Sequence, residues 1–168
     1  MKNLKAYKAL IIIAMVFCAN NIFAQSNKDE VPSVVLAAFT TKYPKAEIKK
    51  WATNNNEYTA KGIEGRHKFY AAFGKNSVWI KTTSKINWSW NLPSEIRASM
   101  KENGYASWRI DKLEKVETPT GDFYQVMVDN LFKQIDSDHA GFAENLVLKF
   151  KPNGELFDKK SLNTTVLL

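Results

Sequence analysis

A diverged internal repeat restricts this chain to few architectures. Val31-Pro32-Ser33 recurs as Leu92-Pro93-Ser94, and in each copy apolar residues follow the proline at helical spacing. Proline suits the first turn of a helix because the amide hydrogen that it lacks would have no partner there. The repeat therefore predicts two helices, which end at the turns Tyr43-Pro44 and Asn103-Gly104. The apolar residues at this spacing are Val34, Val35, Ala38 and Phe39 in the first copy and Ile96 and Met100 in the second.

Strands follow each helix. Alternating and β-branched runs, separated by Gly, Asn and Pro, are typical of antiparallel strands. In each copy a short turn joins the last two strands, Gly74 to Ser77 in the first and Lys151 to Gly154 in the second, which predicts two hairpins. The predicted strands cover residues 47–53, 57–63, 68–74 and 78–83, and then 109–117, 122–128, 144–150 and 156–160.

This order predicts an α+β fold of two tandem repeats, each a helix packed on an antiparallel β-meander of three to four strands. The repeats span about 31–85 and 92–162 and together form a single domain over residues 25–168. A helix covers only one face of such a meander. We therefore expect the other face to be open to solvent or to a partner.

The first 24 residues have the three parts of a cleavable secretory signal peptide. Lys2, Lys5 and Lys8 form a basic start, residues 9–17 form an apolar run, and Ala24 is the small residue before the expected cut. Cleavage between Ala24 and Gln25 would deliver the mature chain to the periplasm or outside the cell.

Two alternatives exist for this segment. A permanent membrane anchor needs roughly 20 predominantly apolar residues, and the polar residues Asn20 and Asn21 end this run too early. A lipoprotein would be acylated at Cys18, but Phe17 before it is not the small residue that such processing favours. We therefore expect no membrane span after cleavage.

Composition limits how the mature chain can be stabilised. Cys18 is the only cysteine, so the mature chain has none and depends on its apolar core. Three of the 24 basic residues precede residue 25 and all 17 acidic residues follow it, so 21 minus 17 leaves a net charge of +4. The charges are interspersed and form no single-sign stripe, which argues against nucleic-acid binding.

The order of aromatic and proline motifs resembles the PepSY-like family of exported bacterial proteins, which is also described as similar to β-lactamase inhibitor proteins. The resemblance covers nearly all of the mature chain and implies tandem helix-plus-sheet repeats and a protein-binding or inhibitory role. It carries no catalytic residues. One departure is the stretch 130–143, which lengthens a hairpin of the second copy. The motifs are Val31-Pro32, Ala38-Phe39, Tyr43-Pro44, Trp51, Tyr58, Phe69 to Phe73, Trp79 to Thr82, Leu92-Pro93, Tyr124 and Leu148 to Gly154.

Most aromatic residues fall at strand positions that alternation would turn toward a helix, which predicts core packing. These are Trp51, Tyr58, Phe69, Phe73 and Trp79.

Trp88 and Trp90 differ because they lie in the connector between the copies, flanked by Asn87 and Asn91. They either seal the junction or form a partner-binding site, since binding residues favour loops on a rigid scaffold.

Motifs for metal binding or catalysis are weak. Asp136, Asp138 and His139 have suitable donor atoms, but their spacing does not match a calcium loop, and a polar hairpin tip explains them better. His67 stands between Arg66 and Lys68 and is expected at the surface. No serine has the sequence context of an activated nucleophile.

The sequence therefore favours an exported non-enzymatic binding module without a cofactor, which binds or inhibits a protein or peptide in the cell envelope. The alternative is a binder of small ligands or envelope glycans that uses exposed aromatic side chains. An enzyme would need a cluster of ionisable groups in one deep pocket.

Overall fold

The fold is given by a computed structural model, which describes residues 25–26, 31–54, 57–130 and 142–166. Two α-helices and a nine-stranded antiparallel sheet make up most of this part of the chain. In chain order the elements are β1 (Gln25–Ser26), α2 (Ser33–Lys42), β2 (Glu47–Asn54), β3 (Glu57–Glu64), β4 (His67–Gly74), β5 (Trp79–Lys85), the 3₁₀ turn η3 (Ser89–Asn91), α3 (Ser94–Glu102), β6 (Arg109–Glu117), β7 (Phe123–Asp129), β8 (Phe142–Phe150) and β9 (Leu156–Val166).

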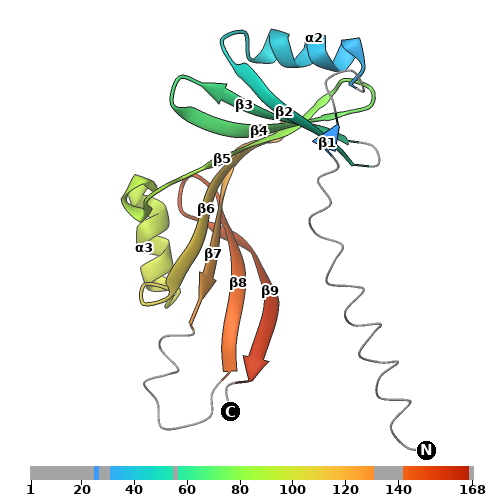
Figure 1. The fold of residues 1–168 in the computed structure, drawn as a ribbon. Coiled ribbons are helices and arrows are strands. Elements are labelled where there is room, and N and C mark those ends of the chain that lie inside the picture. The colour runs from blue at the N-terminus through green and yellow to red at the C-terminus, as the bar shows by residue number, and fades with distance from the viewer. Residues whose placement is uncertain (1–24, 27–30, 55–56, 131–141, 167–168) are drawn as a thin grey trace, which may run out of the picture.

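The sheet runs in simple sequence order from β1 to β9, and each strand is antiparallel to the next. Strands β2–β5 and β6–β9 form two meanders, which the pairing of β5 with β6 joins into one sheet. That pairing extends from Thr82, opposite Glu117, to Lys85, opposite Glu114. Figure 1 shows the continuous sheet bending between the two halves, with α2 against one half and α3 against the other. The predicted α+β class and antiparallel sheet are confirmed.

Both helices cover the same face of the sheet, as the strand register shows. Phe69, which packs with α2, lies opposite Ser84, and Ser84 lies opposite Lys115. Lys115 lies opposite Tyr124, which in turn lies opposite Phe150 in the core under α3. Directly opposite residues point to the same side of a sheet. The other side therefore carries neither helix, and we call it the open face.

Each helix closes its own apolar core. Val35 and Phe39 of α2 pack with strand residues of the first half, and Ile96 and Met100 of α3 pack with those of the second half. Four of the five predicted core aromatics are buried, and Trp79 packs against the same core while half-buried. The buried strand residues include Trp51, Tyr58, Phe69, Ala71 and Phe73 under α2, and Leu113, Val126, Val128, Leu146, Leu148 and Phe150 under α3.

Both helices begin at the residue after their proline, so Pro32 and Pro93 are N-cap residues rather than members of the first helical turn, where they were predicted. Val34 does not join the buried face of α2, because it lies one position away from Val35 and 57% of its surface is exposed. The inclusion of Val34 in that face was therefore wrong. The amide nitrogen of Tyr43 donates to the carbonyl of Phe39 and closes the last turn at 2.8 Å.

Two strand boundaries differ from the prediction. Strand β9 continues to Val166 rather than ending near Lys160, because its pairing with β8 extends as far as Phe142. The alternating apolar pattern fades after Lys160, so the sequence did not indicate this continuation. Strand β8 begins at Phe142, inside the stretch that was assigned to a lengthened hairpin.

Candidate functional site

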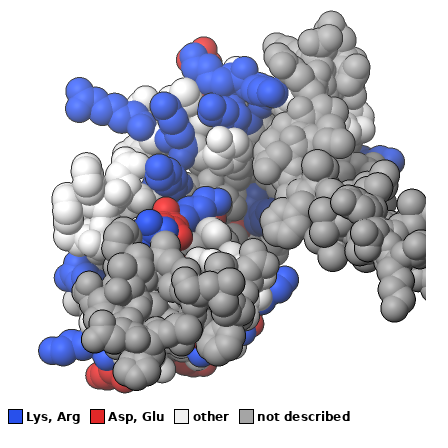
Figure 2. Space-filling view, turned by 60° about the horizontal axis from the view of Figure 1, so that its bottom comes forward, with Lys and Arg blue, Asp and Glu red and all other residues white. Residues whose placement is uncertain are grey.

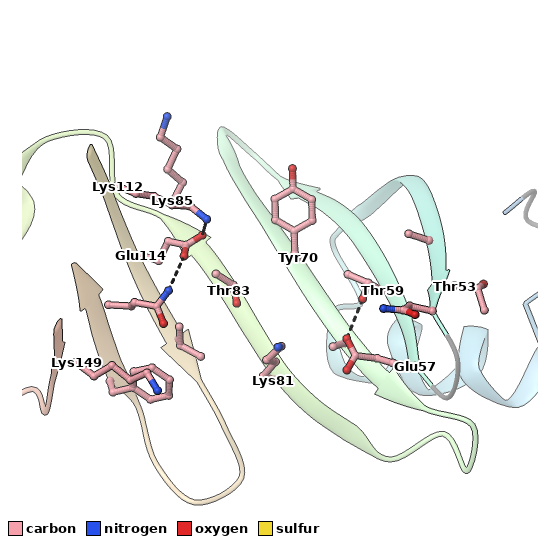
Figure 3. Close-up of a pocket in the computed structure, with 16 residues that line it drawn as sticks. Thr53, Glu57, Thr59, Tyr70, Lys81, Thr83, Lys85, Lys112, Glu114 and Lys149 are labelled. Atoms are coloured by element: carbon pink, nitrogen blue, oxygen red, sulfur yellow. Dashed lines mark hydrogen bonds and ion pairs between the residues drawn. The ribbon is translucent and has the colours of Figure 1, made fainter. Parts of the chain in front are cut away.

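The open face is hollowed into a groove of about 810 Å³ that crosses the junction of the two halves. Its lining comes from strands β2 to β8, so it belongs to the sheet as a whole. Figure 3 shows Lys81, Thr83 and Lys85 of β5 in the middle of it, with Tyr70 of β4 on one side and Glu114 of β6 on the other.

The register fixes the middle of the groove. Lys61 lies opposite Tyr70, and Tyr70 lies opposite Thr83. The row continues through Val116 to Phe123. A rigid ladder of paired backbone therefore sets the spacing of these side chains, at about 4.8 Å from strand to strand.

Strand β5 is anchored from its other side. The side chain of Thr82 is buried, and a hydrogen bond joins its hydroxyl to that of Tyr43 at the end of α2. The indole Nε1 of Trp79 donates to the same hydroxyl at 2.9 Å. The ammonium of Lys42 lies 3.6 Å from the centre of the Trp79 ring, and burial raises the pKa of the Tyr43 hydroxyl. Because Thr82 faces inward, Lys81 and Thr83 must project into the groove.

Aromatic side chains form the apolar part of the groove and its rim. Tyr70 is 44% exposed although it lies in the centre of a strand. Phe123 contacts Phe157 of β9 edge to face, with ring centres 5.9 Å apart. Exposed aromatic residues on a sheet surface are the type that anchors protein interfaces.

Charged side chains surround these rings, and lysines predominate. Lys112 pairs with Glu114 at 2.9 Å, and Lys149 pairs with Asp158 at 2.8 Å. Lys81 and Lys85 have no ion pair among the described residues. In the space-filling view, Lys and Arg side chains gather over the upper part of the molecule and Asp and Glu are sparse there (Figure 2).

The connector residues selected from the sequence form a separate surface. Trp88 and Trp90 are 57% and 65% exposed, and their rings stack on each other with centres 4.8 Å apart and planes 7° from parallel. Asn87 and Asn91 beside them are exposed as well. The guanidinium of Arg97 in α3 donates to the carbonyl of Trp90 at 2.7 Å and so fixes the connector. None of the four lines the groove.

The weak metal candidates Asp136, Asp138 and His139 lie outside the described residues. Within the described ranges, no three His, Cys, Asp or Glu side chains come together as a metal site would require. His67 is exposed at the start of β4, as predicted.

Two aspartates that do not line the groove, Asp111 of β6 and Asp129 at the end of β7, share contacts with Arg109. Asp129 is buried, and Arg109 donates to it through Nε at 2.7 Å. Arg109 also pairs with Asp111 at 3.1 Å. Burial, and then contact with the Asp129 carboxyl, raise the pKa of Asp111 above its ordinary value, although Arg109 opposes the shift.

The groove lysines were not predicted from the sequence. A signal was present, because Lys81, Thr83 and Lys85 alternate with Thr82 and Ser84 along one strand. Alternation shows that these residues share a face. It cannot show that β5 lies at the centre of the sheet, since that depends on the pairing with β6.

No helix in the described part of the chain has the length and apolar character needed to cross a membrane. No curated protein matches the sequence at a significant level.

Several solved structures from Bacteroides species share the fold. A BLIP-like protein of Bacteroides fragilis has 22% sequence identity and a TM-score of 0.66, over 78% of this chain and 86% of that one. A DUF2874 family protein of Bacteroides uniformis has 17% identity and a TM-score of 0.67, over 78% and 89%. A Bacteroides eggerthii structure described as "putative periplasmic proteins" has 15% identity and a TM-score of 0.66, over 79% and 89%.

The family is settled by the sequence itself. A family model described as "Putative beta-lactamase-inhibitor-like, PepSY-like" matches residues 23–70 and 64–158, which together are most of the chain. The description names an inhibitor-like protein and no reaction. With the continuous antiparallel sheet, the two helices on one face and the open groove on the other, this match means that the chain belongs to the PepSY-like, β-lactamase-inhibitor-like family.

Proposed function

We propose that this protein is a non-enzymatic module of the cell envelope that binds a protein or peptide across its open face. The observation that carries the proposal is the groove, in which the exposed ring of Tyr70, the half-buried ring of Phe123 and several lysine side chains stand on a paired backbone. Such a surface needs little ordering when a partner binds, so less of the contact energy is lost to conformational entropy.

The composition of the groove supports a protein partner. Interfaces commonly have a few aromatic anchors surrounded by polar groups that exclude water. Tyr70 and Phe123 fit the first role, and Lys81, Lys85 and Gln125 fit the second. The groove is partly open and extends over strands β2 to β8, which favours a loop or strand of a partner over a small molecule.

Membership of an inhibitor-like family favours one form of this function. The relative from Bacteroides fragilis is described as BLIP-like, and a protein whose groove holds a loop beside the active site of an enzyme would act as an inhibitor. The groove indicates how this chain would bind a target, and it does not identify the target.

We also propose that residues 25–168 are one domain of two repeats, about 31–85 and 92–162. Matching irregularities support the repeat. The pairing of β2 with β3 shifts between Ile48 and Lys50, and that of β6 with β7 shifts between Ile110 and Lys112. The pairings of β4 with β5 and of β8 with β9 shift just before Phe73 and Phe150. Bulges at matching places in two halves favour duplication of one unit.

Export through a signal peptide that ends at Ala24 remains part of the proposal and places the partner in the periplasm or outside the cell. The "putative periplasmic" description of one structural neighbour supports this location. The mass of the protein recovered from an envelope fraction tests it. A chain that begins at Gln25 is expected, whereas an uncut chain in the cytoplasm would contradict it.

The experiment compares capture of envelope proteins by wild type and three folded variants. The groove variant is Tyr70→Ala with Lys81→Glu, the connector variant is Trp88→Ala with Trp90→Ala, and the control is Lys75→Glu in the Gly74 to Ser77 turn. All changed residues are exposed, so folding should be retained.

We expect wild type and the control variant to capture the same partner and the groove variant to lose it. Binding of the purified partner then confirms that the contact is direct. Equal capture by the groove variant and wild type would contradict the groove as the binding surface. Loss with the connector variant alone would assign binding to Trp88, Trp90, Asn87 and Asn91 instead.

A glycan or small-ligand binder is the second candidate, and the stacked pair Trp88–Trp90 is the observation in its favour. The outer faces of the pair are exposed and could stack on a sugar ring, with Asn87 and Asn91 as hydrogen-bonding neighbours. Titration of tryptophan fluorescence with envelope glycan fragments tests this candidate. A response that the Trp88→Ala, Trp90→Ala variant lacks would support it, and a flat response would remove it.

A further inference from the structure

A smaller hollow of about 190 Å³ lies beside the groove, at its β2–β3–β4 end. Lys50, Thr59, Lys61 and Tyr70 contribute to its lining. Thr59 and Tyr70 also line the groove, so the two spaces are adjacent and share a wall. A segment lying in the groove can therefore extend a side chain into the hollow.

The two lysines stand directly opposite each other in the pairing of β2 with β3. Like charges at directly opposite positions destabilise a sheet. Among the described residues neither ammonium has an ion pair, so no carboxylate relieves the repulsion. Two uncompensated cations at one place form a ready site for an anion.

The other polar groups are consistent with that role. The Thr59 hydroxyl donates to Glu57 at 3.2 Å and is already engaged. The Tyr70 hydroxyl has no hydrogen-bond partner among the described residues, and its ring is 44% exposed. The hollow therefore offers two ammonium groups and a phenol as donors, with an aromatic ring against which an aliphatic chain can pack.

We propose that this hollow binds a carboxylate side chain of an acidic segment of the partner protein; this inference rests on the proposed function. Lys81 extends the positive surface along the groove, because Thr59 lies opposite Ala72 and Ala72 lies opposite Lys81. Two strand spacings separate Thr59 from Lys81, or about 10 Å. An extended run of four acidic residues spans that distance, at about 3.3 Å per residue.

The test uses a fluorescein-labelled hexaglutamate peptide as the probe and measures fluorescence anisotropy at low and physiological salt. The test variant is Lys50→Gln with Lys61→Gln. The matched control, Lys75→Gln with Lys101→Gln, removes the same charge from two exposed lysines that do not line the groove or the hollow. Lys50→Arg with Lys61→Arg keeps the charge.

We expect the Gln pair at positions 50 and 61 to weaken peptide binding at least fivefold relative to the control, and the Arg pair to retain it. The same Gln pair should raise the melting temperature, because the repulsion between the lysines is gone. A merely structural role for the lysines would lower the melting temperature instead.

Equal binding by the two Gln pairs would overturn the proposal. So would displacement of the peptide by inorganic phosphate at a concentration where free glutamate has no effect, since the hollow would then select phosphate over carboxylate. Failure of the carboxylate site can be distinguished from failure of the groove as the binding surface. A partner that the Gln variant still captures and the Tyr70→Ala, Lys81→Glu variant loses would keep the groove and remove only the carboxylate site.

Discussion

Ser77 and Gly154 occupy the same position in two hairpin turns with the same hydrogen bonds. The amide of Ser77 donates to the carbonyl of Gly74, and the amide of Gly154 donates to that of Lys151, both at 2.9 Å. The backbone of both residues is in the left-handed region, with φ of 62° for Ser77 and 88° for Gly154. Only glycine adopts this conformation without steric cost.

Ser77→Gly should therefore stabilise the protein. Relief of the left-handed strain is worth roughly 1–2 kcal/mol, and the greater freedom of glycine in the unfolded chain offsets about 0.4–1 kcal/mol of it. We expect a net gain of about 0.5–1 kcal/mol in the free energy of unfolding, measured by urea denaturation. No change or a loss would show that the turn accepts serine without strain.

Gly154→Ser should have the opposite effect. A Cβ there would lie 2.6 Å from the backbone carbonyl oxygen of Glu95 in α3, and neither backbone can move freely. The loss should exceed about 2 kcal/mol, since overpacking adds to the conformational strain. A loss no larger than the gain from Ser77→Gly would contradict this contact.

Gly62 is required by the ring of Phe69, which lies directly across the β3–β4 pair. A Cβ at Gly62 would lie 2.4 Å from the ring Cζ, and the ring is packed in the core under α2. Gly62→Ala should cost about 1–3 kcal/mol in the free energy of unfolding. Gly74→Ala is the control, because its nearest obstacle is the end of the exposed Asn76 side chain, which can turn aside at the cost of one long hydrogen bond from the Val78 amide. Equal effects of the two changes would refute the role of Phe69.

Stability should depend on pH with opposite signs at Asp111 and Asp158. The raised pKa of Asp111 means that its contribution to stability is present below its ordinary value of 3.8 and is lost as pH rises through the folded value. Asp111→Asn should therefore be more stable than wild type at pH 7, by less than about 1 kcal/mol for a partly exposed group. The difference should vanish near pH 3.

Asp158 behaves in the reverse sense. Its hydrogen bond to Lys149, and then the charge of Lys149, lower its pKa, so its contribution is present above the ordinary value and lost as pH falls through the folded value. Asp158→Asn should lower the melting temperature at pH 7, and this loss should diminish as pH falls below the ordinary pKa of 3.8. Shifts of the same sign for Asp111→Asn and Asp158→Asn would contradict this assignment.

Local patterns predicted most of the fold. The prolines at 32 and 93 indicated the helix starts to within one residue, because proline is favoured near the start of a helix, where its missing amide hydrogen costs nothing. Strand β6 was predicted with both of its observed ends. Each of the other long strands was predicted with at least one end within a few residues of the observed end. The exposed surface of Val34 was missed because both Val34 and Val35 fit an apolar helical pattern, and packing decides between them.

The site was harder to predict because it depends on contacts between distant segments. The pairing of Thr83 with Val116 joins residues on either side of the connector and α3, and no local pattern specifies it. That pairing places Lys81 and Lys85 of β5 in the middle of the groove rather than at the edge of a sheet. The exposure of Trp88 and Trp90 fits their position in the connector, but their stacking depends on the turn that η3 makes.

The most direct test of the groove as a binding surface is site-specific photo-crosslinking in native envelope. The crosslinking residue p-benzoylphenylalanine would replace Tyr70 in the groove, Trp90 in the connector or Lys75 in the outer turn, one at a time. We expect a discrete crosslinked protein from Tyr70→p-benzoylphenylalanine and none from the change at Lys75. A crosslinked partner from the Trp90 position alone, or equal products from Tyr70 and Lys75, would contradict it.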